Sequence, residues 1–290
     1  MILIDGKQAG EKKKKELATQ IAGMLDNEEK VPHLAAVIVG DDPASNTYVK
    51  NKEKAAHSIG MISSVYRYPA SIQEDELLDV VDFLNFDEEV DGFIVQLPLP
   101  LHINTARIIE RINPAKDVDG FHPVNAGRML QNLPAYLPAT PFGIIQLLEY
   151  YNIATAGKHC VVLGRSNIVG TPVSILLSRK AKPGNCTVTI CHSQTTNISE
   201  ITRQADILIA AIGVPKFVTA AMVKEGSVII DVGIHRIEEN GESMLVGDVD
   251  FAEVSKKAAA ITPVPGGVGP MTIVALLQNT FKAARKEIYR

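Results

Sequence analysis

Short apolar segments that alternate with helical patterns are the feature that most constrains how this chain can fold. In the first half, buried strands are predicted at His33–Gly40, Ser63–Tyr68 and Asp91–Leu97, and helices at Ala44–Ile59 and Gln73–Phe86 lie between them. The apolar runs are continuous, which is typical of strands covered on both faces. The pattern therefore predicts an α/β fold built on mainly parallel sheets.

The same alternation restarts in the second half, after a proline-rich segment from Pro98 to Pro141 that also contains two short helical stretches. A helix at Ile144–Tyr151 is expected to join the halves, and a last helix is predicted to begin near Met271. The strands and helices predicted between them are His159–Leu163, Val169–Lys180, Thr187–Cys191, Ile198–Gln204, Ile207–Ala211 and Val228–Val232.

The length of 290 residues fits two domains. We expect residues 1–140 to form the first domain and residues 141–271 the second. A C-terminal helix of about 272–290 is expected to pack back on the first domain, and the run Lys12–Lys15 is expected to start an amphipathic helix.

Composition and charge exclude several classes of protein. The net charge of -4 and the pI of about 6.0 are unlike those of a dedicated nucleic-acid binder. No apolar run reaches the ~18 residues of a membrane span, and Asp5 and Lys7 follow the short apolar start too closely for a signal peptide. Cys160, Cys186 and Cys191 suit neither a disulfide framework nor a metal quartet. We therefore expect a cytoplasmic protein with no nucleic-acid partner, no membrane partner and no bound metal.

A glycine-containing turn, GRSNIVG from Gly164 to Gly170, links the predicted strand His159–Leu163 to the next helix. Strand, glycine turn and helix form the setting in which backbone N–H groups and a helix N-terminus hold a pyrophosphate. The spacing departs from GxGxxG, because Ser166 replaces the second glycine and one extra residue precedes Gly170. The position of the turn predicts a dinucleotide site, although many glycine turns bind nothing.

The end of the next predicted strand favours NADP over NAD. In an NAD site, an Asp or Glu at this position binds the ribose 2′-hydroxyl. This chain instead reads CHSQT from Cys191 to Thr195, without a carboxylate. A carboxylate would repel a 2′-phosphate, whereas His192, Ser193 and Arg165 can accept one. An ordinary polar loop is the alternative.

Tyr48 and Lys52 lie four residues apart on the predicted helix Ala44–Ile59, so they share one face. A lysine whose charged form is disfavoured by burial and by like charges can act as a general base. Lys50 and Lys54 flank Lys52 and are expected to lower its pKa modestly. The alternative is that the pair is ordinary packing, since most helical lysines are solvated.

Three further segments combine special residues. Gln96 follows a buried strand at the edge where ligands gather in open α/β sheets, although a packed amide is the alternative. Asp117 and Asp119 lie in KDVDGF, a pattern most often found in turns, and the other ligands of a calcium loop are missing. The segment Thr262–Thr272, TPVPGGVGPMT, predicts a stiff loop that permits close backbone approach to a flat ligand.

Together these segments closely resemble the bifunctional methylenetetrahydrofolate dehydrogenase/methenyltetrahydrofolate cyclohydrolase family. The matching blocks follow the family order over nearly the whole chain. One position departs: Ala139 stands where the family commonly has cysteine, which the chemistry does not require. The blocks lie within Val39–Lys52, Asp91–Pro100, Lys116–Phe121, Gly164–Pro172, Cys191–Thr195, Ala210–Phe217, Val228–Ile234, Gly247–Phe251 and Thr262–Thr272.

The resemblance implies two α/β domains with a cleft between them, the second a Rossmann-like NADP-binding domain, and a homodimer. It implies oxidation of 5,10-methylene-tetrahydrofolate to 5,10-methenyl-tetrahydrofolate by hydride transfer to NADP, then hydrolysis to 10-formyl-tetrahydrofolate, within one-carbon metabolism and purine biosynthesis. The alternatives are a monofunctional dehydrogenase and a folate- or nucleotide-binding protein without activity. The complete set of Lys52, Gln96 and Asp119 counts against both.

The resemblance also implies roles for single residues. Lys52 is the catalytic lysine, Tyr48 stacks on the folate, Gln96 is the partner of the lysine and Asp119 binds the pterin. A neutral Lys52 is expected to take the proton of the attacking water, because an ammonium would be repelled by the methenyl cation. The implied folate contacts are Tyr48, Lys52, Val95, Gln96, Leu97, Asp119, Pro265, Gly266, Gly267, Thr272 and Ile273. The implied NADP contacts are Gly164, Arg165, Ser166, Val169, Gly170, His192, Ser193, Thr195, Gly213 and Ile234.

Overall fold

Parallel strand pairing organises this chain into two units in the computed structural model, which describes residues 1–239 and 242–289. We call Lys12–Ala139 with Ile273–Arg290 the N-terminal unit, and Met1–Glu11 with Thr140–Thr272 the C-terminal unit. Both units are α/β structures with mainly parallel strands, which confirms the predicted fold class.

The division differs from the expected domains at the start of the chain. Met1–Glu11 joins the C-terminal unit, whereas the prediction placed it in the first domain. The reason is β1 (Ile2–Leu3), which pairs in parallel with β11 (Ala260–Ile261). A two-residue strand is too short to produce a periodic signal, so its partner could not be inferred from the sequence.

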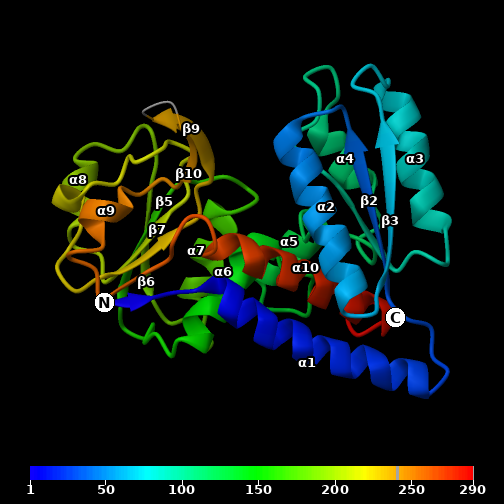
Figure 1. Cartoon of the computed structure of the whole chain (residues 1–290), viewed down its shortest axis with the longest axis horizontal. Coiled ribbons are helices and arrows are strands. Elements are labelled where there is room, and N and C mark those ends of the chain that lie inside the picture. Colours follow the sequence, from blue (N-terminus) through cyan, green and yellow to red (C-terminus); the bar gives the residue numbers. More distant parts are fainter. Residues whose placement is uncertain (240–241, 290) are drawn as a thin grey trace. The chain divides into compact units, whose positions relative to one another are not determined.

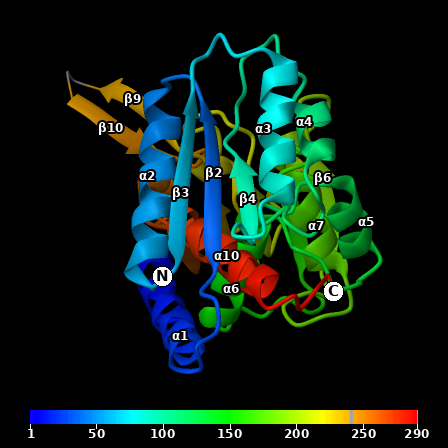
Figure 2. The same cartoon turned by 90° about the vertical axis from the view of Figure 1, so that its right-hand side faces the viewer.

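The sheet of the N-terminal unit has the strand order β3–β2–β4, with parallel pairing throughout (Figure 2). Alternate residues of β2 point to opposite faces, and both sets are buried: Val37 packs with Leu77 and Val81 of α3, while Ala36 and Ile38 are buried on the other face. This confirms a strand covered on both faces for β2, whereas the edge strand β3 has no fully buried residue. The elements in chain order are β2 (His33–Val39), α2 (Pro43–Ser58), β3 (Ile62–Tyr68), α3 (Glu74–Phe86), β4 (Gly92–Val95), α4 (Thr105–Arg111) and α5 (Pro123–Leu130).

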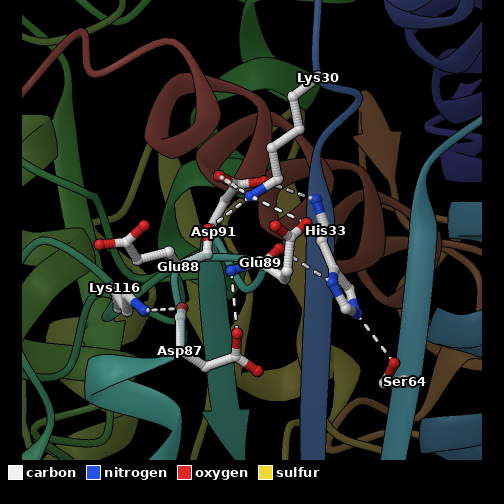
Figure 3. Close-up of polar contacts among 8 residues, drawn as sticks. All are labelled: Lys30, His33, Ser64, Asp87, Glu88, Glu89, Asp91 and Lys116. Carbon is white, nitrogen blue, oxygen red and sulfur yellow. Dashed lines mark hydrogen bonds and ion pairs between the residues drawn. The ribbon is translucent and has the colours of Figure 1, made fainter.

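Polar contacts close the amino edge of this sheet (Figure 3). The Asp91 carboxylate accepts a hydrogen bond from the backbone N–H of His33 at 2.8 Å, and the Lys30 ammonium lies 3.5 Å from its other oxygen. The His33 ring contacts the Glu89 carbonyl oxygen at 3.0 Å and the Ser64 hydroxyl at 2.8 Å. The charged and polar groups at this edge therefore satisfy one another.

Lys116 caps the end of α3 at the same edge (Figure 3). Its ammonium donates to the carbonyl oxygens of Leu84 at 2.9 Å and Asp87 at 2.5 Å. A cation at a helix C-terminus satisfies carbonyl groups that have no helical partner and interacts favourably with the helix dipole. This contact fixes α3 against the segment that leads to Asp117.

Within the described residues, the sheet of the C-terminal unit contains six parallel strands in the order β1–β11–β8–β7–β5–β6. Figure 1 labels β5, β6 and β7 of this sheet. An antiparallel hairpin of β9 and β10 pairs separately from this sheet. The elements are β5 (His159–Leu163), α7 (Gly170–Ser178), β6 (Thr187–Cys191), α8 (Ile198–Thr202), β7 (Ile207–Ala210), η1 (Ala220–Met222), β8 (Val228–Asp231), β9 (His235–Glu239), β10 (Glu242–Val246) and α9 (Phe251–Val254).

Two helices begin earlier than predicted, in each case around a proline. α6 spans Ala139–Tyr150 and α10 spans Val268–Ala284. Pro141 and Pro270 lie in their first turns, where a missing backbone N–H breaks no helical hydrogen bond. Prolines that indicated a loop therefore belong to helix starts.

The first helix, α1 (Gly6–Asp26), also begins before the predicted Lys12–Lys15 segment. The Asp5 carboxylate accepts hydrogen bonds from the backbone N–H groups of Lys7 at 2.8 Å and Gln8 at 3.1 Å, which is the contact of an N-cap residue. None of the described helices is long and apolar enough to span a bilayer. The three cysteines are buried free thiols.

Candidate functional site

Lys52 lies on the buried face of α2. Val49, Lys52 and Ala56 are the buried residues of this helix, and their spacing of three and four places them on one stripe. Only 5% of Lys52 is exposed, whereas its neighbours Lys50 and Lys54 are exposed. Of these three lysines, only Lys52 occupies a buried position, which would normally carry an apolar residue.

Two side chains hold the Lys52 amine. Its Nζ donates a hydrogen bond to Gln96 Oε1 at 3.1 Å and lies 4.7 Å from the centre of the Tyr48 ring. Gln96 Nε2 donates in turn to the carbonyl oxygen of Leu97 at 2.7 Å, which orients the amide so that its oxygen faces the lysine. Gln96 follows Val95, the last residue of β4, so the carboxyl end of this strand positions the partner of the amine.

Burial lowers the pKa of Lys52, and the negative charge of Asp119 partly offsets this effect. Burial also raises the pKa of Asp119, and Lys52 partly offsets that effect in turn. The effect of burial agrees with the expectation, but the modest further lowering expected from Lys50 and Lys54 is not found, because residues two apart on a helix do not face each other and both flanking side chains are exposed. The site therefore favours a neutral amine through desolvation.

The two aspartates of KDVDGF have different environments. Asp117 is buried, and its carboxylate accepts hydrogen bonds from the backbone N–H of His122 at 2.8 Å and from the Asn125 side chain at 2.9 Å. Burial raises the pKa of Asp117 to about 7. Asp119 makes no side-chain hydrogen bond with any described residue. Asp117 thus builds the turn, while the Asp119 carboxylate has unused acceptor capacity beside Lys52.

The C-terminal helix supports this turn from within the same unit. Asn279 of α10 donates from Nδ2 to the carbonyl oxygens of Val118 at 2.8 Å and Leu137 at 2.9 Å. Gly120 has a φ of 74°, and a Cβ there would lie 2.6 Å from the Leu137 carbonyl carbon. Glycine is therefore required directly after Asp119.

In the C-terminal unit, the predicted glycine turn is a tight loop at the start of α7. A Cβ on Gly164 would lie 2.1 Å from the Ala211 carbonyl oxygen, and one on Gly170 would lie 2.3 Å from the Gly164 carbonyl oxygen. The Ser166 hydroxyl closes the loop by accepting a hydrogen bond from the backbone N–H of Val169 at 3.1 Å. Ser166 therefore replaces the second glycine with a side chain that binds the loop itself.

The residues predicted to contact a dinucleotide follow four adjacent strands. The order β8–β7–β5–β6 is parallel, so the carboxyl ends of these strands meet at one edge. The glycine turn follows β5, His192–Thr195 follows β6, Gly213 follows β7 and Ile234 follows β8. After β5 the chain forms β6 on one side of that strand and then β7 on its other side. This change of direction makes the carboxyl ends of these strands a topological switch point, where ligands bind in open α/β sheets.

The turn after β6 contains no carboxylate. The backbone N–H of His192 donates to the Thr195 hydroxyl at 2.9 Å, and His192 Nδ1 accepts from the backbone N–H of Gln194 at 3.2 Å, so Nε2 is the ring donor. Ser193 and Arg165 are exposed, and neither side chain has a hydrogen bond or ion pair to any described residue. The side chains of Ser193 and Arg165 can therefore bind a phosphate group without first breaking another hydrogen bond or ion pair.

The loop near the C-terminus is anchored within the C-terminal unit. The backbone N–H of Gly6 donates to the Gly266 carbonyl oxygen at 2.9 Å, and the hydroxyl groups of Thr272 and Thr140 lie 3.1 Å apart. Ile273 is the first residue of the segment assigned to the N-terminal unit. The predicted folate contacts that lie in the C-terminal unit are Pro265, Gly266, Gly267 and Thr272.

Sequence reasoning missed one pair of buried carboxylates. Asp231 ends β8 and Asp248 follows β10, and they are 4% and 0% exposed. No group of three or more His, Cys, Asp or Glu side chains in residues 1–239 and 242–289 could hold a metal ion. A signal was present: each aspartate lies in an apolar or glycine-containing run, VIIDVGI or GDVDF, where a charge is unusual.

Family models match both parts of the chain. Residues 4–119 match the model described as tetrahydrofolate dehydrogenase/cyclohydrolase, catalytic domain. Residues 138–288 match the model described as tetrahydrofolate dehydrogenase/cyclohydrolase, NAD(P)-binding domain. Lys52, Gln96 and Asp119 fall in the first match, and the glycine turn falls in the second.

Relatives are similar over the full length. The bifunctional protein FolD of Cytophaga hutchinsonii is 56% identical over 287 residues, which cover 98% of this chain and 99% of the relative. A crystal structure of the bifunctional enzyme FolD, methylenetetrahydrofolate dehydrogenase/cyclohydrolase, from Campylobacter jejuni has a TM-score of 0.93 at 47% identity, with 99% of each chain covered. The Trypanosoma brucei enzyme, solved with NADP cofactor and inhibitor, has a TM-score of 0.93 at 36% identity and covers 100% of this chain and 99% of its own.

Proposed function

Because this chain belongs to the tetrahydrofolate dehydrogenase/cyclohydrolase family, we propose that it catalyses both reactions of the family name. It oxidises 5,10-methylene-tetrahydrofolate to 5,10-methenyl-tetrahydrofolate with NADP as the hydride acceptor, and hydrolyses the product to 10-formyl-tetrahydrofolate. The observation that carries the hydrolytic role is the buried Lys52 amine, hydrogen-bonded to Gln96 at 3.1 Å.

The hydrolysis needs a base, and Lys52 is suited to be one. The water oxygen bonds to the methenyl carbon, and one water proton passes to the lone pair of the neutral Lys52 amine. The bond between this carbon and N5 then breaks with its electron pair moving to N5, while the hydroxyl oxygen forms the formyl C=O and its proton passes to N5, so the formyl group stays on N10. A neutral amine can donate one N–H to Gln96 and still offer its lone pair to water. The lowering of the Lys52 pKa by burial supports this protonation state.

We assign substrate orientation to two further side chains. The pterin edge presents a ring N–H beside an amino group, and the Asp119 carboxylate can accept both hydrogen bonds in a bidentate manner. Its lack of a side-chain partner among the described residues supports this role. Tyr48, 4.7 Å from the Lys52 amine, is assigned to stacking on the folate ring system. The remaining proposed folate contacts are Val95, Leu97, Pro265, Gly266, Gly267, Thr272 and Ile273.

The C-terminal unit fits the dinucleotide. The glycine turn approaches its neighbours so closely that a Cβ would clash, and such turns hold a pyrophosphate at a helix N-terminus. When bound, NADP supplies the acceptor for the hydride of the methylene group. We assign its 2′-phosphate to His192, Ser193 and Arg165, since the turn after β6 lacks the carboxylate of an NAD site. The other proposed NADP contacts are Gly164, Ser166, Val169, Gly170, Thr195, Gly213 and Ile234.

We also propose that the protein is a cytoplasmic homodimer, from its resemblance to the family. Light scattering after gel filtration tests the dimer: the expected mass is twice the 31.3 kDa of one chain. A mass of one chain at micromolar concentration would contradict it.

One assay separates the proposed function from its alternatives. Methylene-tetrahydrofolate is supplied with NADP or with NAD, and the formation and decay of the methenyl product are followed by absorbance. We expect formation with NADP and decay faster than in protein-free buffer. Formation with decay at the buffer rate would indicate a monofunctional dehydrogenase. Saturable ligand binding without turnover would indicate a binding protein.

A further inference from the structure

We propose that Asp248 and His235 form a positioning pair for the NADP-binding edge of the C-terminal unit. This inference rests on the proposed binding of NADP at the carboxyl ends of β5 to β8. The pair acts through the backbone: it fixes the turn after β7 and the segment after β8 that carries Ile234.

Asp248 binds two segments at once. Its Oδ2 accepts hydrogen bonds from the backbone N–H groups of Ile212 at 2.7 Å and Gly213 at 3.1 Å. Its Oδ1 contacts His235 Nε2 at 2.7 Å. A carboxylate only accepts hydrogen bonds, so Nε2 carries the proton. The turn that contains Gly213 is thereby linked to the residue directly after Ile234.

Asp231 fixes Asp248 in turn. Its Oδ1 accepts from the backbone N–H groups of Asp248 at 2.9 Å and Gly233 at 3.0 Å, and its Oδ2 accepts from that of Val249 at 3.0 Å. No side chain fits between these groups: a Cβ on Gly247 would lie 1.9 Å from an Asp231 oxygen. Glycine is therefore required in VIIDVGI and GDVDF, because it leaves room for the two carboxylates to accept hydrogen bonds from backbone N–H groups.

The turn held by Asp248 forms one wall of the glycine turn. Ala211, directly before Ile212, has its carbonyl oxygen 2.1 Å from where a Cβ of Gly164 would stand. Backbone hydrogen bonds also join the segment around Asp248 to the residues that follow Gly213. The N–H of Val218 donates to the Asp248 carbonyl oxygen at 2.9 Å, and the N–H of Lys216 donates to the Gly247 carbonyl oxygen at 3.0 Å. A shift of Ile212 and Gly213 would therefore displace the backbone against which the glycine turn packs, and with it the proposed pyrophosphate site.

His235 is the accessible half of the pair. Its side chain is 21% exposed, whereas that of Asp248 is fully buried, so His235 can be replaced without opening the core. Ile234, its neighbour, is 53% exposed at the same edge. Removing the Nε2–H donor leaves one oxygen of a buried carboxylate without its side-chain partner, which is costly in a low-dielectric site.

The test compares His235→Leu with His235→Gln, which keeps a side-chain N–H donor. We measure the dissociation constant of NADP, the KM for NADP, and methenyl hydrolysis in the absence of nucleotide. For His235→Leu we expect NADP affinity to fall about tenfold, the loss of one hydrogen bond to a buried charge, with hydrolysis unchanged. His235→Gln is expected to recover most of that affinity.

Asp248→Asn and the double variant test whether the two side chains act as a pair. In Asp248→Asn, the amide oxygen still accepts the hydrogen bonds from Ile212 and Gly213, but His235 loses its carboxylate partner. We therefore expect a loss of NADP affinity similar to that of His235→Leu. The double variant of His235→Leu and Asp248→Asn should bind NADP little more weakly than either single variant. Asp250→Asn is the matched control, because Asp250 makes no capping hydrogen bond at the start of α9. Its NADP affinity should equal that of the wild type.

Two results would overturn the positioning role. One is an NADP affinity of His235→Leu equal to that of the wild type. The other is a parallel loss of NADP affinity, hydrolysis and melting temperature that His235→Gln does not rescue, which marks a purely structural contact. If the wild-type chain itself binds no NADP while hydrolysing methenyl-tetrahydrofolate, the proposed cofactor site falls and the inference falls with it.

Discussion

A lysine and an aspartate lie near each end of β4, but their capacity for hydrogen bonds and ion pairs is used at one end and left open at the other. Before the strand, Asp91 accepts a hydrogen bond from His33 and lies 3.5 Å from the Lys30 ammonium (Figure 3). After the strand, the Lys52 amine has the Gln96 amide oxygen as its hydrogen-bond acceptor, and Asp119 has no side-chain hydrogen bond to any described residue.

The difference lies in solvent and partners rather than in residue type. The Lys30 side chain is 41% exposed and pairs with carboxylates and a carbonyl group, so its charge is satisfied. Lys52 is 5% exposed, and burial lowers its pKa. One edge of the sheet uses polar groups for stability, while the other leaves an amine and a carboxylate with capacity for a ligand.

Lys52→Met should have the largest effect. The variant removes the proposed base while filling the same volume with an apolar side chain, which a buried position tolerates. Methenyl hydrolysis should fall about a thousandfold, within the range of general-base catalysis. Stopped-flow absorbance measures the rate, with protein-free hydrolysis subtracted.

Lys50→Met is the matched control, because Lys50 lies two residues away on α2 and is exposed. Its rate should equal that of the wild type, and so should that of Lys30→Met at the opposite edge. A Lys52→Met enzyme that keeps wild-type hydrolysis would end the assignment of the base.

Gln96→Glu should reduce hydrolysis at neutral pH by about tenfold to a hundredfold, because a carboxylate beside Lys52 favours its ammonium form. In the wild type, the rate should rise with pH as the amine loses its proton, through a pKa below 10.5. In the variant, this rise should move to higher pH. A pH profile of Gln96→Glu that coincides with the wild-type profile would show that Gln96 does not act through the lysine.

Asp91→Ala should change stability instead of turnover. It leaves the His33 backbone N–H without its side-chain acceptor, which costs about 1–3 kcal/mol. Urea unfolding followed by circular dichroism measures the loss, and Asp91→Asn, which keeps an acceptor oxygen, should lose less. A fall in kcat at unchanged stability would contradict the separation of the two edges.

Lys30→Met should have the smallest effect on unfolding, at most about 1 kcal/mol, because partly exposed ion pairs contribute little. The same urea experiment measures it, and added salt should shrink the difference from the wild type. A loss as large as that of Asp91→Ala would mean that the ion pair, rather than the hydrogen bond to His33, closes this edge.

Much of the fold follows from local patterns in the sequence. β5 and β6 coincide with the predicted strands His159–Leu163 and Thr187–Cys191, because each apolar run is bounded by polar or glycine residues. The β9–β10 hairpin was not predicted, since HRIEE and ESMLV contain several charges and pair only with each other. Part of its connection lies outside the described residues.

The site was predicted less completely than the fold. The spacing of Tyr48 and Lys52 predicts a shared helix face, but Lys50 and Lys54 look equivalent to Lys52 in composition. Only the stripe formed by Val49 and Ala56 separates the buried lysine from the exposed ones. The link between Asp248 and His235 was out of reach, because it depends on how β8, β9 and β10 meet.

The proposed hydrolysis requires a Lys52 amine that is largely neutral under working conditions, and titration of this amine is the decisive measurement. Protein labelled with ¹³C at lysine Cε gives one resonance per lysine, and Lys52→Met identifies the signal by its disappearance. We expect the Lys52 resonance to titrate below the ordinary pKa of 10.5 and to report mainly the neutral amine at the pH of the hydrolysis assay. A resonance that still reports the ammonium at that pH would overturn the assignment, because an ammonium cannot take a proton from water.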